Sequence, residues 1–196
     1  MFDKFIGKFV KNAEDVENPQ VRERYGVFSG LTGIILNALL SLAKIITGAL
    51  TGAISIVTDG VNNLSDAASS VVTLLGFKLA GKKADKRHPF GHGRMEYFAG
   101  LTVSVIIIIV AAELLKSSIE KIVAGEVVKY SSDAAFAVSL SVLAVSVLVK
   151  LWMTLFNAKI AKKIDSVANK ATALDSLSDC AATSLVIICA VISRFV

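Results

Sequence analysis

The stretch TDGVNNLSDAASS, residues Thr58 to Ser70, decides the fold and raises the main question about this sequence. It belongs to an apolar run long enough to cross a membrane, yet it contains two aspartates, two asparagines and three serines. A charged side chain near the middle of a bilayer costs about 2.5–3.5 kcal/mol on insertion scales. Acids at this depth therefore need a structural or functional reason.

The composition around this stretch is that of a membrane protein. Of the 196 residues, 54% are hydrophobic, whereas the helices of a soluble domain need a polar outer face. A helix needs roughly 20 apolar residues to cross a hydrocarbon core about 30 Å thick. Runs of this kind predict an all-α bundle of transmembrane helices. The five runs lie at residues 26–50, 53–79, 96–119, 134–158 and 171–195.

The net charge of +5 follows membrane topology and does not indicate nucleic-acid binding. Lysines and arginines concentrate before the first run and in the connections after the second and fourth runs. The positive-inside rule then places the N-terminus and both basic connections in the cytosol. We expect a multi-pass protein of the cell membrane, the inner membrane in a bacterium. Residues 25–196 form the membrane domain, and residues 1–24 form a cytosolic segment that is either a surface helix or a frayed tail.

Polar residues form a stripe along one face of the second and fifth runs, because they recur at spacings of three and four. Each stripe contains two oxygen-bearing side chains four residues apart. At 1.5 Å per residue, the pair on the second run lies roughly 13–20 Å below the outer face. The pair on the fifth run lies roughly 18–24 Å below it, so the two pairs can meet at one level. The pairs are Asn62 with Asp66 and Asp175 with Asp179.

Three carboxylates at one level predict a bound divalent cation, because they cannot all stay ionised without a counter-charge. An all-oxygen ligand set suits hard ions such as Mn²⁺ or Mg²⁺. Zinc sites usually recruit histidine or cysteine instead. The alternative is that these side chains only join helices by hydrogen bonds. That alternative accounts less well for two matched acidic pairs at comparable depth.

Two lysines lie within the apolar runs. Lys44 in the first run is at the depth of Asp59, so we expect an ion pair between them and do not count Asp59 as a metal ligand. Lys150 in the fourth run has two possible roles. It either extends toward the cytosol or neutralises the acidic cluster, and the sequence does not choose between these.

The cytosolic connection ADKRHPFGHGRMEYFAG, residues 84–100, contains both histidines of the chain. Asp85, His88 and His92 can converge on a metal, since the glycines allow a tight backbone. The same residues can equally form a structural cap. Both interpretations stay open at this point.

Together these stretches resemble the transmembrane part of a cation diffusion facilitator, a family of divalent-metal/proton antiporters. The resemblance rests on TDGVNNLSDAASS, on ADKRHPFGHGRMEYFAG and on DSLSD at residues 175–179, and it extends from about Tyr25 onward. It implies a homodimer with six membrane helices and usually a cytosolic metal-sensing domain. The sequence has only five runs, so we expect either a segment of a longer protein, which we favour, or a protein that lacks those parts.

The resemblance also implies the site residues. The family's central metal site maps onto Asn62, Asp66, Asp175 and Asp179. Zinc-type members place histidine in one or both leading positions, which Asn62 and Asp175 hold here, so the pattern is similar to the manganese-type branch. Related transporters bind a second metal in the cytosolic loop, at positions that match Asp85, His88 and His92.

We therefore expect a Mn²⁺/H⁺ antiporter that works by alternating access, with Zn²⁺, Fe²⁺, Co²⁺ and Mg²⁺ as alternative cargo. Protons enter because emptying the site leaves clustered carboxylates that must be neutralised. The expected partners are the metal ion, protons, the bilayer and a second copy of the chain, with no nucleic acid and no resident cofactor. An intramembrane aspartyl protease is a remote alternative, because a two-Asp dyad needs no i, i+4 partners and no GxGD-like stretch is present. A metal channel is the third possible function.

Overall fold

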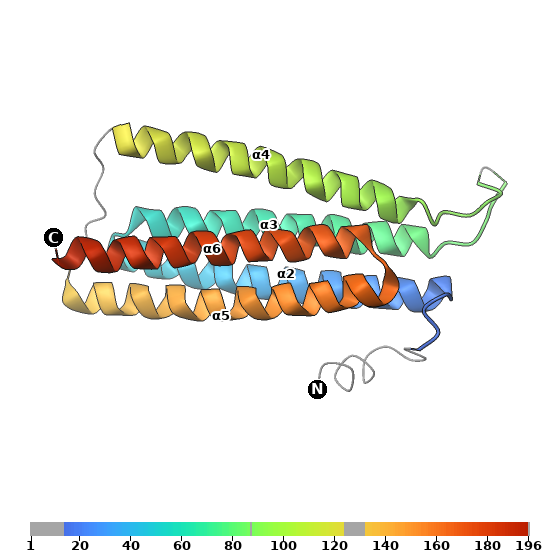
Figure 1. Ribbon diagram of the computed structural model, residues 1–196, viewed down its shortest axis with the longest axis horizontal. Helices are drawn as coiled ribbons and strands as arrows, with labels where there is room; N and C mark the ends of the chain where they lie inside the picture. The colour runs from blue at the N-terminus through green and yellow to red at the C-terminus, as the bar shows by residue number, and fades with distance from the viewer. Residues whose placement is uncertain (1–13, 87, 124–131, 196) are drawn as a thin grey trace.

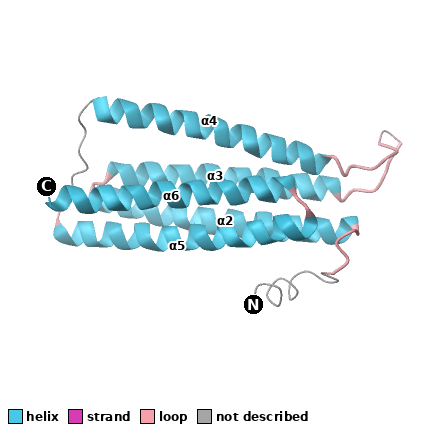
Figure 2. Cartoon of the chain, in the orientation of Figure 1, coloured by secondary structure: helices cyan, strands magenta, loops and turns pink. Residues whose placement is uncertain are grey.

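The structure is a computed structural model that describes residues 14–86, 88–123 and 132–195. Within these residues the chain forms long helices and no strand (Figures 1 and 2), which confirms the predicted all-α architecture. The predicted surface helix near the N-terminus falls mainly on residues 1–13, outside the described part. The helices are α2 (Pro19–Thr51), α3 (Ile54–Ala80), α4 (Met95–Val123), α5 (Asp133–Ile164) and α6 (Val167–Phe195).

Four of the described helices, α2, α4, α5 and α6, are long and apolar enough to cross a membrane. The chain is therefore a multi-pass membrane protein. Helix α3 has 27 residues and carries the polar stripe, which lowers its hydropathy. It packs along α2 and also contacts α4 and α6. A membrane span at residues 53–79 stays a prediction for this helix.

The helices extend beyond the apolar runs at the predicted cytosolic end of the bundle. Helix α2 begins at Pro19, where the Asn18 side chain accepts a hydrogen bond from the Gln20 backbone N–H, a common start for a helix. Helix α5 continues to Ile164. The hydropathy of the sequence identifies only the part of a helix that can lie in hydrocarbon. The additional turns at this end are stabilised by packing between helices. They contribute to a buried cluster of Val21, Tyr25, Phe77, Phe156, Ile160, Ile164 and Ala168.

Two tight hairpins make up most of the bundle (Figure 1). Helices α2 and α3 are joined through Gly52, whose φ of 74° is easily reached only by glycine. Helices α5 and α6 are joined through Asp165 and Ser166, and Asp165 has a φ of 47°. Short connections make each pair of helices antiparallel neighbours.

Glycines line the contact between α2 and α3. A Cβ atom added at Gly30 would lie 2.7 Å from the Leu74 Cβ, and one at Gly48 would lie 2.6 Å from the Val57 Cγ2. Small residues allow membrane helices to approach closely. The α2–α3 hairpin is therefore a closely packed pair over most of its length.

Helix α4 is held at its first turns and lies further from the bundle toward Val123 (Figure 1). At the near end, Gly76 of α3 contacts Ala99, and Arg22 Nη2 lies 3.0 Å from Glu96 Oε2. At the other end the side chains are exposed, as for Leu115, which is 65% exposed, and Val123, which is 82% exposed. The α4 contacts thus concentrate at the predicted cytosolic end.

Replacing Gly76 with leucine should destabilise the protein, because any Cβ at this position meets Ala99. Overpacking costs about 1–3 kcal/mol, which we expect to appear as a lower Tm of the purified protein in detergent. Gly93→Ala is the control, since a Cβ there meets nothing within 4 Å. An unchanged Tm for Gly76→Leu would show that α4 does not depend on this contact.

A buried polar layer occupies the middle of the bundle. On one side lies the large apolar cluster described above, and on the other lies a smaller one of Ala53, Ile56 and Leu143. Between them the structure buries amide, hydroxyl and charged side chains from α2, α3, α5 and α6. These include Asn37, Ser41, Lys44, Asn63, Asp66, Ser69, Ser70, Ser146, Lys150 and Ser176.

Candidate metal centre

Three carboxylates meet in this polar layer. Asp66 comes from α3, while Asp175 and Asp179 come from successive turns of α6 and share one face of it. One carboxylate oxygen of each residue lies within 4.8 Å of the others. Asp66 is buried and the other two are half-buried. The structure thus brings together the three acids that the sequence pairs predicted at one depth.

Asn62 joins this cluster from the turn of α3 before Asp66. Its side-chain Nδ2 donates a hydrogen bond to Asp179 Oδ1 at 3.2 Å. Its Oδ1 is buried and has no hydrogen-bond partner among the described residues. An amide oxygen in this position can coordinate a cation, so all four predicted residues lie together.

The four residues line a cavity of about 150 Å³ between α3, α4 and α6. One water occupies about 30 Å³ in the liquid, so the cavity is large enough for a partly hydrated ion. Serine hydroxyls and the apolar side chains of Ile106, Ile107, Val110 and Ala111 from α4 complete the lining. The α4 residues that line the cavity have no distinguishing sequence pattern, because an apolar residue that faces a cavity looks like one that faces lipid.

Lys150 of α5 also contacts this cluster, although it does not line the cavity. Its Nζ lies 2.6 Å from Asp66 Oδ2 and 2.5 Å from Asp179 Oδ2, and the side chain is 1% exposed. Of the two roles that the sequence left open, the structure shows the neutralising one. When all groups are ionised, three carboxylates and one ammonium leave an excess of negative charge.

A second buried ion pair lies nearer the α2–α3 turn. Lys44 Nζ is 2.8 Å from Asp59 Oδ2, as predicted from their depth. Asp59 is seven residues before Asp66, about 10 Å along α3. It belongs to no cluster with the other acids in the described part of the chain.

The loop between α3 and α4 brings Asp85, His88 and His92 together, with one ligand atom of each within 4.8 Å of the others. Asp85 Oδ1 lies 3.2 Å from His88 Nδ1, and Asp85 Oδ2 lies 3.6 Å from His92 Nε2. The His88 backbone N–H also donates to Asp85 Oδ1 at 2.7 Å, as in a turn cap. The geometry is therefore compatible with both interpretations of this loop.

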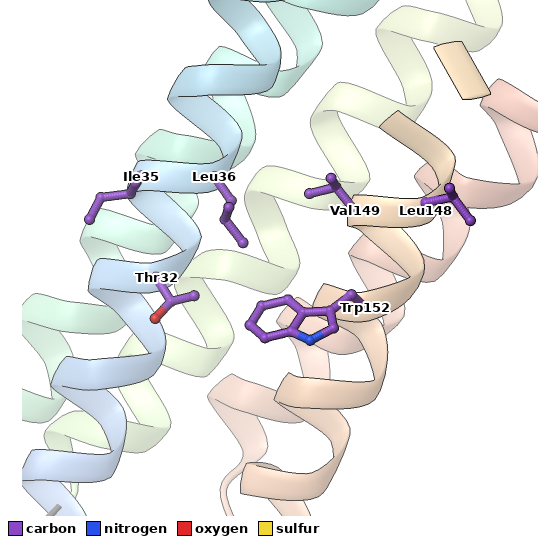
Figure 3. Close-up of a pocket in the computed structure, with 6 residues that line it drawn as sticks. All are labelled: Thr32, Ile35, Leu36, Leu148, Val149 and Trp152. Atoms are coloured by element: carbon purple, nitrogen blue, oxygen red, sulfur yellow. The ribbon is translucent and has the colours of Figure 1, made fainter. Parts of the chain in front are cut away.

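A cavity of about 440 Å³ between α2 and α5 is of a different kind (Figure 3). It has no ionisable group in its lining, and its one hydroxyl, on Thr32, donates to the Phe28 carbonyl at 2.8 Å. The six lining residues therefore offer a cation no charged ligand. The lining residues are Thr32, Ile35, Leu36, Leu148, Val149 and Trp152.

Comparison with known proteins adds independent evidence. A model of the cation efflux transmembrane domain matches residues 31–196. The chain is 32% identical over 165 residues to an uncharacterized transporter of Methanocaldococcus jannaschii. The aligned region covers 84% of the chain and 56% of the relative. It is 33% identical over 162 residues to the manganese efflux system protein MneS of Bacillus subtilis, and this region covers 80% of the chain and 54% of MneS.

The magnetosome protein MamB of Magnetospirillum gryphiswaldense is 30% identical over 149 residues, covering 76% of the chain and 48% of that protein. The chain thus spans about half the length of these relatives. The family model covers most of the chain and includes both helices that carry the acidic cluster. This chain therefore belongs to the cation efflux, or cation diffusion facilitator, family of membrane transporters.

Proposed function

We propose that the protein exports a divalent metal ion, Mn²⁺ by preference, in exchange for protons. The observation that carries the proposal is the meeting of three carboxylates from α3 and α6 inside a cavity of the bundle. The transported ion binds to Asn62, Asp66, Asp175 and Asp179. When it leaves, protons replace part of its charge, since clustered carboxylates repel one another.

The preference for manganese rests on the chemistry of the ligands. All four proposed ligands offer oxygen, which suits hard divalent ions. The nearby Cys180 is not among the lining residues, and its thiol lies 3.9 Å from the Val147 carbonyl oxygen. The resemblance to a protein named as a manganese efflux system supports the same choice.

The transport cycle in this proposal is alternating access. The contacts of α4 with α2 and α3 concentrate at one end of the bundle, so α4 can move relative to α3 at the other. We further propose that the N-terminus is cytosolic, that the cell membrane is the location and that the working unit is a homodimer. Cross-linking of single-cysteine variants in membranes can test the dimer.

Transport into proteoliposomes tests the function. With an outwardly directed proton gradient and equal Mn²⁺ on both sides, an antiporter accumulates Mn²⁺ inside the vesicles, whereas a channel does not. Dissipating the gradient with an ionophore should stop the accumulation. Flux that only follows the Mn²⁺ gradient would contradict antiport, and the absence of flux for Mn²⁺, Zn²⁺, Fe²⁺, Co²⁺ and Mg²⁺ would contradict the transport function.

The loop cluster gives a separate prediction. If Asp85, His88 and His92 bind a second ion, then replacing both histidines with alanine should lower the bound metal by one ion per chain. Metal analysis of the purified protein after gel filtration measures this. Lys83→Ala, at an exposed loop position, is the matched control. An unchanged metal content would show that the histidines only cap the loop.

A further inference from the structure

The Lys150 ammonium group lies where a metal ion would contact the acidic cluster. It reaches Asp66 Oδ2 and Asp179 Oδ2, which come from different helices, at 2.6 and 2.5 Å. The other oxygen of Asp179 accepts the hydrogen bond from Asn62. Both Asp179 oxygens are therefore engaged by donors within this chain.

A divalent ion and this ammonium group compete for the same oxygens. Oxygen ligands of Mg²⁺ and Ca²⁺ lie about 2.0–2.6 Å from the ion, a range similar to the Lys150 contacts. Two cations that share these lone pairs would also repel each other in a buried site. A metal ion that takes Asp66 Oδ2 or Asp179 Oδ2 as a ligand therefore displaces Lys150 from that carboxylate.

We propose that Lys150 is a tethered cation that holds the transport site while it is empty and is displaced by the incoming metal. This inference rests on the transport site proposed above. Its consequence is that Lys150 lowers the affinity for metal and assists metal release. The lysine thus acts as a built-in competitor.

The displaced ammonium has other buried oxygen acceptors at its own level. Ser146 lies one turn before Lys150 on the same face of α5, about 6 Å away between Cβ atoms. Asn63 lies one turn before Asp66 on α3. The side-chain oxygens of both residues are buried and have no hydrogen-bond partner among the described residues.

Asn37 of α2 offers a third acceptor, since its Oδ1 is also buried without a partner in the described chain. The hydrogen bond from Ser29 Oγ of α2 to Asn157 Oδ1 of α5, at 2.7 Å, shows which residues of the two helices lie at the same height in the bundle. Asn37 lies about 12 Å along α2 from Ser29, and Lys150 lies about 10.5 Å along antiparallel α5 from Asn157. Three helices thus place a buried acceptor near the level of Lys150.

The chain contains a matched control for this proposal. Lys44 is also 1% exposed and paired to an aspartate within the membrane domain. Its partner, Asp59, lies outside the acidic cluster. A change at Lys44 therefore removes a buried ion pair without removing a competitor for the metal.

Titration calorimetry of the purified protein with Mn²⁺ tests the proposal. Lys150→Met, which keeps the length of the apolar stem, should lower the Kd for Mn²⁺ at least tenfold, and it should slow turnover in proteoliposomes because release is slower. Lys44→Met should not lower the Kd. If Lys150→Met binds Mn²⁺ with the wild-type Kd or more weakly while its Tm is normal, the proposal is overturned.

Substitution of the acceptors provides a second test that keeps Lys150. In the wild-type background, Asn37→Leu and Ser146→Ala should raise the Kd for Mn²⁺ several-fold, because the displaced ammonium loses its alternative partners. In a Lys150→Met background the same changes should have no effect, as a double-mutant cycle would show. If both variants fold and bind as the wild type does, the proposal fails even where Lys150→Met does not fold.

Different results would overturn the proposed function and the role of Lys150. A wild-type protein that binds none of the tested divalent ions overturns the proposed function together with this inference. A wild-type protein that binds Mn²⁺, with no gain on removing Lys150, overturns the inference alone.

Discussion

Replacing Asp179 with alanine is expected to abolish Mn²⁺ transport and to weaken Mn²⁺ binding roughly a hundredfold or more. Asp179 offers a carboxylate to the proposed site and also contacts both Asn62 and Lys150. Changing a residue that only orients a metal ligand costs about 10–100-fold in metal affinity, so losing a carboxylate ligand itself should cost at least as much, and each tenfold change in Kd is about 1.4 kcal/mol. Calorimetry and uptake into proteoliposomes measure the two effects.

The control for this prediction changes the ion pair between Lys44 and Asp59. Lys44→Gln combined with Asp59→Asn removes both charges, and because the new side chains can still hydrogen-bond, no buried charge is left unpaired. This double variant should retain Mn²⁺ binding. Transport by Asp179→Ala at the wild-type rate would place the metal path elsewhere in the protein.

Replacing Asn62 with histidine should shift metal preference toward Zn²⁺, with the ratio of Zn²⁺ to Mn²⁺ affinity rising about tenfold or more. The Asn62 Oδ1 is buried beside Asp179 and has no hydrogen-bond partner in the part of the chain that the structure describes, at a position of the proposed metal site. An imidazole nitrogen favours zinc over harder ions. Competition binding of Mn²⁺ and Zn²⁺ to the purified variant gives the ratio.

The control for this second prediction is Asn62→Gln, which keeps an amide oxygen and should keep the preference for Mn²⁺. If Asn62→His leaves the ratio unchanged, the hardness of the ligand at this position does not select the metal. The selectivity would then have to come from the size or the hydration of the cavity.

The sequence predicted the acidic cluster because its geometry follows from the helix itself. A spacing of four residues places Asp175 and Asp179 on one face, and counting residues from the membrane surface gives their depth. The ion pair between Lys44 and Asp59 was predicted in the same way and is confirmed at 2.8 Å. The depth of each residue needs no knowledge of how the helices pack, whereas the meeting of the two pairs depends on the packing of α3 against α6.

The role of Lys150 could not be predicted, because a long apolar stem allows its ammonium to reach a membrane surface or a buried partner. The packing of α5 against α6 and α2 decides between them, and it directs Lys150 to Asp66 and Asp179. The α4 side of the cavity was missed for a related reason. Its residues, such as Ile107 and Val110, are apolar, and the sequence does not distinguish an apolar residue that lines a cavity from one that faces lipid.

The two hairpins divide the proposed ligands between them. Asn62 and Asp66 belong to the glycine-packed α2–α3 pair, whereas Asp175 and Asp179 belong to the α5–α6 pair. A coordination shell tolerates errors of only about 0.2 Å in its distances, so a small slip of one pair past the other breaks the shell into halves. Under the proposed function, the affinity for the ion therefore depends on how the two hairpins are placed relative to each other, and a displacement of one along the other would release the ion.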